Sequence, residues 1–243
     1  VVQAANLLIA AGSVPKSVSP SAPGFLTSDD VFTLDETPAS LAIIGGGVIG
    51  CEMAHIFSCL GARVTVIEAL DRILVTEDPE ISAGLVRIMR QVDFITGARI
   101  TDIDGQGPYS LSVASPTGSC TLRVEKVLVC VGRAPALPPG LKEIGAALRE
   151  GGGVAVDEYQ QTTLPHVYAV GDVTGAYMFA YAASKAAEVV VDHIMGGDRR
   201  MSYDNIPSIV FTDPEIASVG SASGAVRRGT FPVSALGRAR TME

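Results

Sequence analysis

The sequence predicts an α/β protein with a doubly wound, Rossmann-like parallel sheet, and three observations predict it. A short apolar run from Leu41 to Ile44 leads directly into the glycine cluster of residues 45–47. Apolar residues then recur at helical spacing, and a second apolar run follows from Val64 to Ile67. Strands that alternate with helices in this order are typical of parallel sheets with helical crossovers.

The composition limits the classes of function. With 243 residues, of which 47% are hydrophobic and 18% charged, the chain is long enough for a buried core and too apolar for intrinsic disorder. A formal net charge of -8 disfavours nucleic acids and anionic membranes as partners. No stretch has the length and apolarity of a membrane span or a signal peptide. We therefore expect a cytoplasmic protein that binds small molecules.

The chain begins with Val1 inside an apolar segment, so we expect it to be a partial chain. Residues 1–12 are predicted to form a strand that ends at Gly12. The Ser/Pro-rich residues 13–23 that follow are predicted to cross between two domains.

The central segment should contain two strand-helix units. Residues 41–44 and 64–67 are the strands, and the helix between them is predicted to end at Gly61. Asp78 and Pro79 are predicted to start the second helix, as cap and first helical residue. The predicted buried face of this helix consists of Ile81, Leu85, Ile88, Met89 and Val92.

The second half of the chain should return to the same sheet. Residues 109–131 are predicted to form an antiparallel excursion that ends in a buried strand at residues 127–131. Residues 134–140 are Pro-rich and are predicted to be a second domain crossing. Residues 167–172 are predicted to form a strand, which an alanine-rich helix follows.

The glycine cluster has the spacing Gly-x-Gly-x-x-Gly of a dinucleotide-binding loop. Gly45 makes the tight turn, Gly47 lets the backbone approach a pyrophosphate, and Gly50 lets the helix pack closely on the strand. The free N–H groups at the helix start, including those of Val48 and Ile49, are expected to bind the phosphates. A simple turn is the alternative, but the position between a buried strand and an amphipathic helix favours the nucleotide site.

Glu68 ends the second strand, 23 residues after Gly45. At this position an acid accepts hydrogen bonds from the adenosine ribose and selects NAD(H) over its 2'-phosphorylated relative. Two unit charges about 4 Å apart repel by roughly 4 kcal/mol at an effective dielectric of about 20. The alternative for Glu68 is a solvated acid at the end of a strand.

Beyond this loop, five segments resemble the pyridine nucleotide-disulfide oxidoreductases. Leu8–Ser13 matches a strand end of the flavin domain, Ile43–Glu52 matches the NAD loop, and Val127–Pro135 matches a return segment. Val167–Asp172 matches the second flavin motif, and Ile206–Gly220 matches the opening of the interface domain. The resemblance implies four units. Residues 1–35 are the end of a first FAD-domain segment, and residues 36–137 are the NAD-binding domain. Residues 138–200 are a second FAD-domain segment, and residues 201–243 are the start of an α+β interface domain.

The resemblance also implies further cofactor-binding residues. Glu52 takes the family position that meets the nicotinamide carboxamide, and Asp172, beside Gly171, takes the position that holds the ribityl chain of FAD. Gly12 and Gly132 lie in two other matching segments and are expected at the cofactors as well. The alternative for Glu52 is an acid that only complements the helix dipole.

Parts of the family pattern have no counterpart in this chain. The N-terminal flavin loop, the paired redox cysteines and the C-terminal His-Glu pair are not found, so we expect no catalytic residue here. Tyr181 stands where a histidine is usual, and residues 221–230 replace a longer helical stretch.

The four cysteines and three histidines suggest neither a redox pair nor a metal site. Cys51 and Cys59 are about 12 Å apart if they share one helix, which is too far for a disulfide. A bridge between Cys120 and Cys130 is a minor alternative, and free thiols are expected.

The reaction implied by the resemblance passes two electrons between a dithiol and NAD through FAD. Dihydrolipoamide is the first expected substrate, and a mercuric or glutathione-type reduction is the alternative. A noncatalytic NAD(H)-binding fragment or a decayed gene product is the alternative of another class. The expected partners are the dinucleotides, with a homodimer or a separately encoded half as the protein partner, and neither nucleic acid nor membrane.

Overall fold

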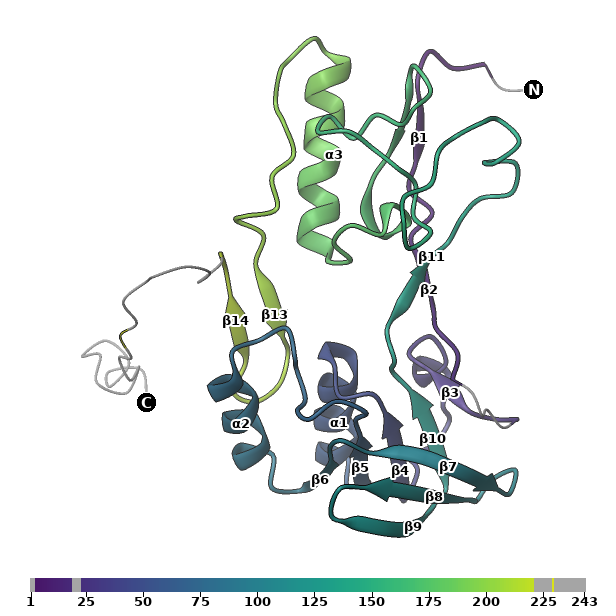
Figure 1. Ribbon diagram of the computed structural model, residues 1–243, viewed down its shortest axis with the longest axis vertical. Helices are drawn as coiled ribbons and strands as arrows, with labels where there is room; N and C mark the ends of the chain where they lie inside the picture. The colour runs from purple at the N-terminus through teal and green to yellow at the C-terminus, as the bar shows by residue number, and fades with distance from the viewer. Residues whose placement is uncertain (1–2, 19–22, 221–228, 230–243) are drawn as a thin grey trace.

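The computed structural model describes residues 3–18, 23–220 and 229. Figure 1 shows two lobes, joined by the crossings at β2 and β11 and by the segment that leads from α3 down to β13. We call residues 23–130 the sheet lobe, which contains α1 and α2, and residues 3–12 with 136–205 the small lobe, which contains α3. In the described part of the chain, no helix is long and apolar enough to cross a membrane.

The sheet lobe is built on a parallel sheet with the strand order β3-β10-β4-β5-β6. In sheet order, the strands are β3 (Leu26–Thr27), β10 (Lys126–Val129), β4 (Ser40–Ile44), β5 (Arg63–Ile67) and β6 (Val92–Ile95). The predicted α/β fold with a parallel sheet is therefore confirmed. Its two central predicted strands, at residues 41–44 and 64–67, are each one residue longer than expected.

Two helices follow strands of this sheet. α1 (Val48–Cys59) connects β4 to β5 and ends before Gly61, whose φ of 90° takes the left-handed conformation expected of a cap. α2 (Pro79–Ile88) begins as predicted, because the Asp78 side chain accepts a hydrogen bond from the N–H of Glu80.

The predicted buried face of α2 is partly wrong. Ile81 and Ile88 are exposed, whereas Leu85, Met89 and Val92 are buried. The helix ends at Ile88, and Val92 already belongs to β6. The apolar residues after Ile88 are therefore buried by the turn into a strand and not by a continued helix.

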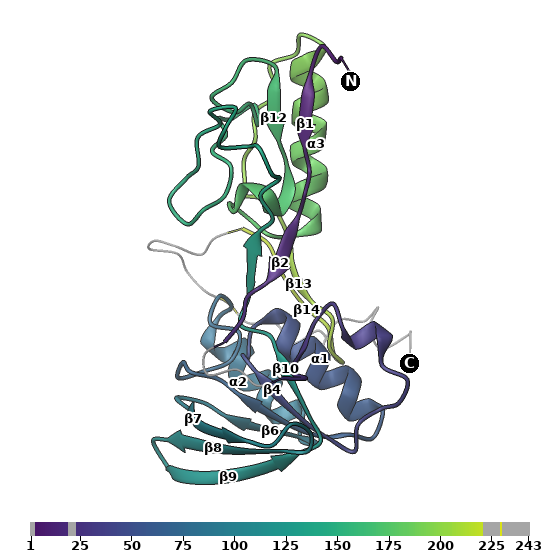
Figure 2. The ribbon, with the colours of Figure 1, turned by 90° about the vertical axis from the view of Figure 1, so that its right-hand side faces the viewer.

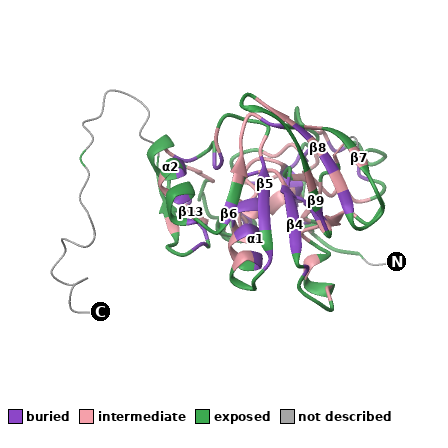
Figure 3. Cartoon of the chain, turned by 90° about the horizontal axis from the view of Figure 1, so that it is seen from below, coloured by how far each residue is buried: buried purple, intermediate pink, exposed green. Residues whose placement is uncertain are grey.

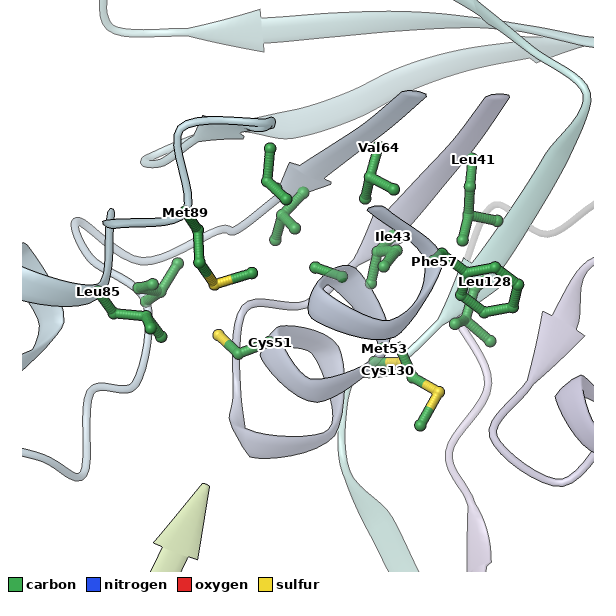
Figure 4. Close-up of a cluster of buried hydrophobic side chains, with 14 of the residues drawn as sticks. Leu41, Ile43, Cys51, Met53, Phe57, Val64, Leu85, Met89, Leu128 and Cys130 are labelled. Carbon is green, nitrogen blue, oxygen red and sulfur yellow. The ribbon is translucent and has the colours of Figure 1, made fainter. Parts of the chain in front are cut away.

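The two faces of the sheet are covered differently. Along β4, Leu41 and Ile43 pack against α1, while Ala42 packs on the opposite side. The opposite side is covered by an antiparallel meander of β7 (Arg99–Asp104), β8 (Tyr109–Ser115) and β9 (Gly118–Val124). Figure 3 shows that β4 and β5 are mostly buried between these layers, and Figure 4 shows side chains of the α1 side.

The two predicted crossings form a structure of their own. β2 (Ser13–Pro15) and β11 (Arg133–Pro135) pair with each other as antiparallel strands between the lobes. In Figure 2 they lie in the narrow region between the sheet lobe and the small lobe. Residues 13–15 are thus strand, where the sequence predicted only a connector.

In the small lobe, β1 (Leu7–Ile9) pairs in parallel with β12 (Val167–Ala169), and α3 (Ala180–Ile194) lies beside them. Both strands are shorter than predicted. The second ends early because Gly171, with a φ of 74°, begins the short 3-10 helix η2 (Gly171–Thr174). The alanine-rich helix is confirmed.

The last described elements are the hairpin strands β13 (Ser208–Val210) and β14 (Ile216–Ser218), which lie beside α1 and α2. The expected domain limits remain predictions. β3 lies inside the expected first FAD-domain segment, residues 1–35, but it pairs with β10 of the parallel sheet. The 3-10 helix η1 (Val31–Thr33) follows β3. Residues 221–230, expected to replace a helical stretch, lie outside the described residues except for Gly229.

Candidate nucleotide-binding site

A cleft of about 970 Å³ opens at the carboxyl ends of β4, β5 and β10 and extends to the start of α3. Ligands of open α/β sheets bind at this edge, where the strands give way to loops. The cleft brings together seven of the residues that the sequence places at the cofactors, namely Gly45, Gly47, Val48, Ile49, Glu52, Glu68 and Gly132.

The three glycines of the loop have different physical requirements. A Cβ on Gly45 would meet the carbonyl oxygen of Cys130, and a Cβ on Gly50 would meet the carbonyl oxygen of Gly45. A Cβ on Gly47 would have no neighbour within 4 Å, although Gly47 lines the cleft. Packing therefore requires Gly45 and Gly50, while the space at Gly47 is open toward a ligand.

The N-terminus of α1 points its free donors at this space. The first helical hydrogen bond runs from the N–H of Cys51 to the carbonyl of Gly47, at 3.0 Å. The N–H groups of Val48, Ile49 and Gly50 come before it and have no acceptor inside the helix. No side chain caps α1, so these donors and the positive end of the helix dipole suit a phosphate.

The Glu68 carboxylate is held in place by the backbone around it. Its Oε2 accepts a hydrogen bond from the N–H of Gly46 at 2.6 Å, and its Oε1 accepts one from the N–H of Leu70 at 2.8 Å. Each carboxylate oxygen has a second lone pair for a ribose hydroxyl. Glu68 thus fixes the glycine loop and faces the cleft at the same time.

Glu52 lies toward another part of the cleft, where the C-terminal hairpin forms the wall. Its Oε1 accepts a hydrogen bond from the backbone N–H of Phe211 at 2.9 Å. Ile209 and Phe211 line the cleft beside it. This contact joins residues far apart in the sequence, so the spacing of motifs gave no sign of it.

Two buried thiols, Cys51 and Cys130, flank the glycine loop. Burial, together with the nearby charges of Glu52 and Glu68, raises the pKa of Cys51 to about 12. Burial also raises the pKa of Cys130 to about 12. Both stay protonated at neutral pH and are poor nucleophiles. All four cysteines are free thiols, and the described residues contain no cluster of metal ligands.

The residues expected at FAD lie in and next to the small lobe, outside the lining of the cleft. Asp172 Oδ2 accepts a hydrogen bond from the Ser13 hydroxyl at 2.6 Å, while Oδ1 has no partner among the described residues. The half-buried carboxylate with one open oxygen fits a hydroxyl donor such as the ribityl chain. Gly12 and Gly171 adjoin this pair and have positive φ angles, of 72° and 74°.

Several cleft residues were missed by the sequence analysis. Ala98, Arg99 and Ile100 line the cleft just after β6. β6 was not predicted from the sequence, so the loop at the carboxyl end of this strand was not recognised as part of the cleft. Tyr181, noted as a departure from the family pattern, lines the cleft near the start of α3 and is 47% exposed.

Comparisons with known proteins agree with this geometry. The chain is 35% identical to a dihydrolipoyl dehydrogenase of Chlamydia muridarum, over 100% of this chain and 55% of the relative. It is 37% identical to a mercuric reductase of Streptomyces lividans, over 90% of this chain and 48% of the relative. The chain thus spans about half the length of these relatives.

Among solved structures, the HOCl-induced flavoprotein disulfide reductase RclA from Escherichia coli superposes with a TM-score of 0.84 at 32% identity, covering 98% of this chain and 57% of that one. Residues 1–187 match the family described as pyridine nucleotide-disulphide oxidoreductase. These matches cover most of the chain and include both lobes, and we conclude that the chain belongs to the pyridine nucleotide-disulphide oxidoreductase family.

Proposed function

We propose that the chain is the nucleotide-binding part of an FAD-dependent, NAD-linked disulfide oxidoreductase that oxidises dihydrolipoamide. The observation that carries the proposal is the single cleft that joins the glycine loop and Glu68 with Glu52 and the start of α3. Such a cleft has the parts to hold both ends of a dinucleotide. The relatives named dihydrolipoyl dehydrogenase support this substrate.

In this proposal, each residue of the cleft binds or orients a part of NAD. The N–H groups of Val48 and Ile49 bind the pyrophosphate above Gly47, and Glu68 receives the adenosine ribose hydroxyls. Glu52 receives the carboxamide N–H of the nicotinamide and sets the plane of the ring. Ile209 and Phe211 exclude water beside that ring.

FAD, when bound, supplies the two-electron chemistry between the nicotinamide and a disulfide. Asp172 would accept a hydrogen bond from a ribityl hydroxyl with its open Oδ1, and Gly171 would let the ribityl chain approach closely. The chain's own part is therefore to position two cofactors, and the expected absence of catalytic residues is part of the proposal.

A mercuric reductase is the second candidate, because the Streptomyces lividans relative of that name has 37% identity. Glu68 disfavours a 2'-phosphorylated cofactor in either case, so it does not separate the two reactions. A glutathione-type reductase or a noncatalytic NAD(H)-binding fragment stays as a further alternative. We also propose a cytoplasmic location, which suits four free thiols, and a homodimer formed through the segment that begins at residue 201.

The proposed cleft is tested with two ligands that differ only in the nicotinamide, NADH and ADP-ribose. Both should bind the chain in calorimetric titrations. Glu52→Gln should weaken NADH about tenfold, which corresponds to one hydrogen bond to a charged acceptor, and leave ADP-ribose unchanged. Glu80→Gln, an exposed acid on α2, is the matched control. An equal loss for both ligands would contradict the placement of the nicotinamide at Glu52.

The disulfide substrate requires a second test, on a flavin-loaded enzyme that combines this chain with the redox cysteines and the His-Glu pair expected outside it. NADH oxidation with lipoamide, glutathione disulfide and mercuric ion should be fastest with lipoamide. Faster turnover with mercuric ion would favour the second candidate. If that combined enzyme binds NADH and flavin but supports none of these reactions, the result would favour the noncatalytic alternative.

A further inference from the structure

We propose that Arg133 is a positioning residue that makes the Ser13 hydroxyl donate its proton in a hydrogen bond to Asp172. In this way it keeps one oxygen of the Asp172 carboxylate open for the flavin. The inference rests on the proposed function, since it takes Asp172 as the acceptor for a ribityl hydroxyl. No motif spacing pointed to the contact between Arg133 and Ser13, which are 120 residues apart.

Arg133 begins β11 and binds both oxygens of Ser13 on the paired strand β2. Its Nε donates to the Ser13 hydroxyl oxygen at 2.7 Å, and its Nη2 donates to the Ser13 carbonyl at 2.8 Å. Two parallel donors from a planar guanidinium give a fixed geometry that a lysine lacks. The Ser13 side chain is thereby held relative to both crossings.

The other end of the guanidinium is anchored in the sheet lobe. Nη1 donates to the Ser28 hydroxyl at 3.0 Å and to Asp29 Oδ1 at 3.1 Å. The Arg133 side chain is 23% exposed, so it is largely shielded, while Asp29 is more open at 58%. Arg133 therefore links Ser13 to Ser28 and Asp29 of the sheet lobe.

The donors and acceptors determine the direction of the Ser13 proton. A guanidinium has only donors and keeps its charge, so the Ser13 hydroxyl oxygen must accept from Nε. The single hydroxyl proton is then free for one acceptor, and Asp172 Oδ2 lies at 2.6 Å. Asp172 is thus fixed at Oδ2, with Oδ1 free to accept.

This arrangement selects the chemistry of the ligand. An open carboxylate oxygen next to a satisfied one receives a hydroxyl donor and repels phosphate. A polyol chain such as ribityl fits, whereas the pyrophosphate of the same cofactor does not. Without Arg133, the Ser13 hydroxyl can rotate and accept instead of donate, so the carboxylate loses its fixed orientation.

The test is the affinity of the chain for FAD, measured by equilibrium dialysis and flavin fluorescence, with NADH titrated in parallel. Ser13→Ala and Arg133→Met should each weaken FAD about tenfold or more. Ser13 lies outside the lining of the cleft, so Ser13→Ala should also change the NADH affinity less than about twofold, whereas Arg133 lines the cleft and the NADH affinity of its variants is no control. The double variant should lose no more than either single one, because both act along one path. Arg200→Met, which removes the two surface ion pairs of Arg200 in the small lobe, is the control.

Three results would overturn the proposal. They are unchanged FAD affinity in Arg133→Met, losses that multiply in the double variant, or no FAD binding by the unmutated chain. Arg133→Lys keeps the charge without the paired donors and should recover only part of the affinity; it decides the question if Arg133→Met does not fold. Failure of the proposed function is distinguishable, because the unmutated chain would then fail to bind NADH.

Discussion

Gly47→Ala should weaken nucleotide binding about 100-fold or more while leaving the fold almost intact. Gly47 is the N-cap of α1, with extended backbone angles that any residue adopts, and a Cβ there meets nothing within 4 Å. Alanine is a poorer N-cap than glycine by less than about 1 kcal/mol. For a chain of this size, that lowers the melting temperature by less than about 4 °C.

The added methyl group should instead weaken the binding of the ligand. It would occupy the space through which the pyrophosphate reaches the N–H groups of α1. Losing two hydrogen bonds to charged oxygen, each about 1.5–3 kcal/mol, weakens NADH by about 100-fold or more.

Gly50→Ala should show the opposite balance. Its Cβ would meet the backbone oxygen of Gly45, which cannot move aside as a flexible side chain can. Overpacking against backbone costs about 3 kcal/mol, of which the helix preference for alanine offsets about 1 kcal/mol. The remaining 2 kcal/mol or so corresponds to a decrease of about 4–8 °C in melting temperature.

Thermal unfolding and calorimetric NADH titration of the two variants separate these effects. Gly84→Ala is the matched control, because Gly84 lies within α2 with nothing within 4 Å and is outside the cleft. It should bind NADH normally and melt slightly higher. If Gly47→Ala binds NADH within about threefold of the unmutated chain, the pyrophosphate does not lie over Gly47 and the reasoning fails.

Three further predictions concern charge, thiols and flavin. The chain should bind NADH at least about 100-fold more tightly than NADPH, and Glu68→Gln should narrow this gap; equal affinities in the unmutated chain would remove the argument from Glu68. Iodoacetamide should alkylate the exposed Cys59 and Cys120 in the native chain, and Cys51 and Cys130 only after unfolding, because burial raises both pKa values to about 12. Mass spectrometry of tryptic peptides checks this, and a disulfide between any two cysteines would refute it. The chain alone should purify colourless and lack NADH-linked lipoamide reductase activity, since the flavin contacts proposed among its described residues are limited to those around Asp172, too few to retain FAD through purification; a yellow preparation that NADH bleaches and lipoamide reoxidises would show otherwise.

Features carried by local sequence were predictable. The run from Leu41 to Ile44 and the three glycines after it specify a strand, a turn and a helix within ten residues. Asp78 and Pro79 likewise specify a helix start, and Asp78 caps α2 as expected. These signals depend on backbone conformations that neighbouring residues determine.

Features that depend on distant partners were not predictable. Val92 fits both the face of a helix and the start of a strand, and only pairing with β5 decides for β6. The bond from Phe211 to Glu52 joins residues 159 apart. Periodicity does not report such contacts, because they follow from how finished elements pack. Sequence patterns therefore identified the glycine loop and Glu68, which line the cleft, and missed the residues that form its other walls.

The pairing of the two crossings restricts how this chain can change its length. β2 and β11 pair over three residues, with Ser13 opposite Pro135 and Pro15 opposite Arg133. One inserted residue in either crossing would shift this register and turn the Ser13 side chain to the other face, away from Arg133. Insertions should therefore be tolerated in the turn between β8 and β9 but not in the crossings, where a change in one strand requires a compensating change 120 residues away.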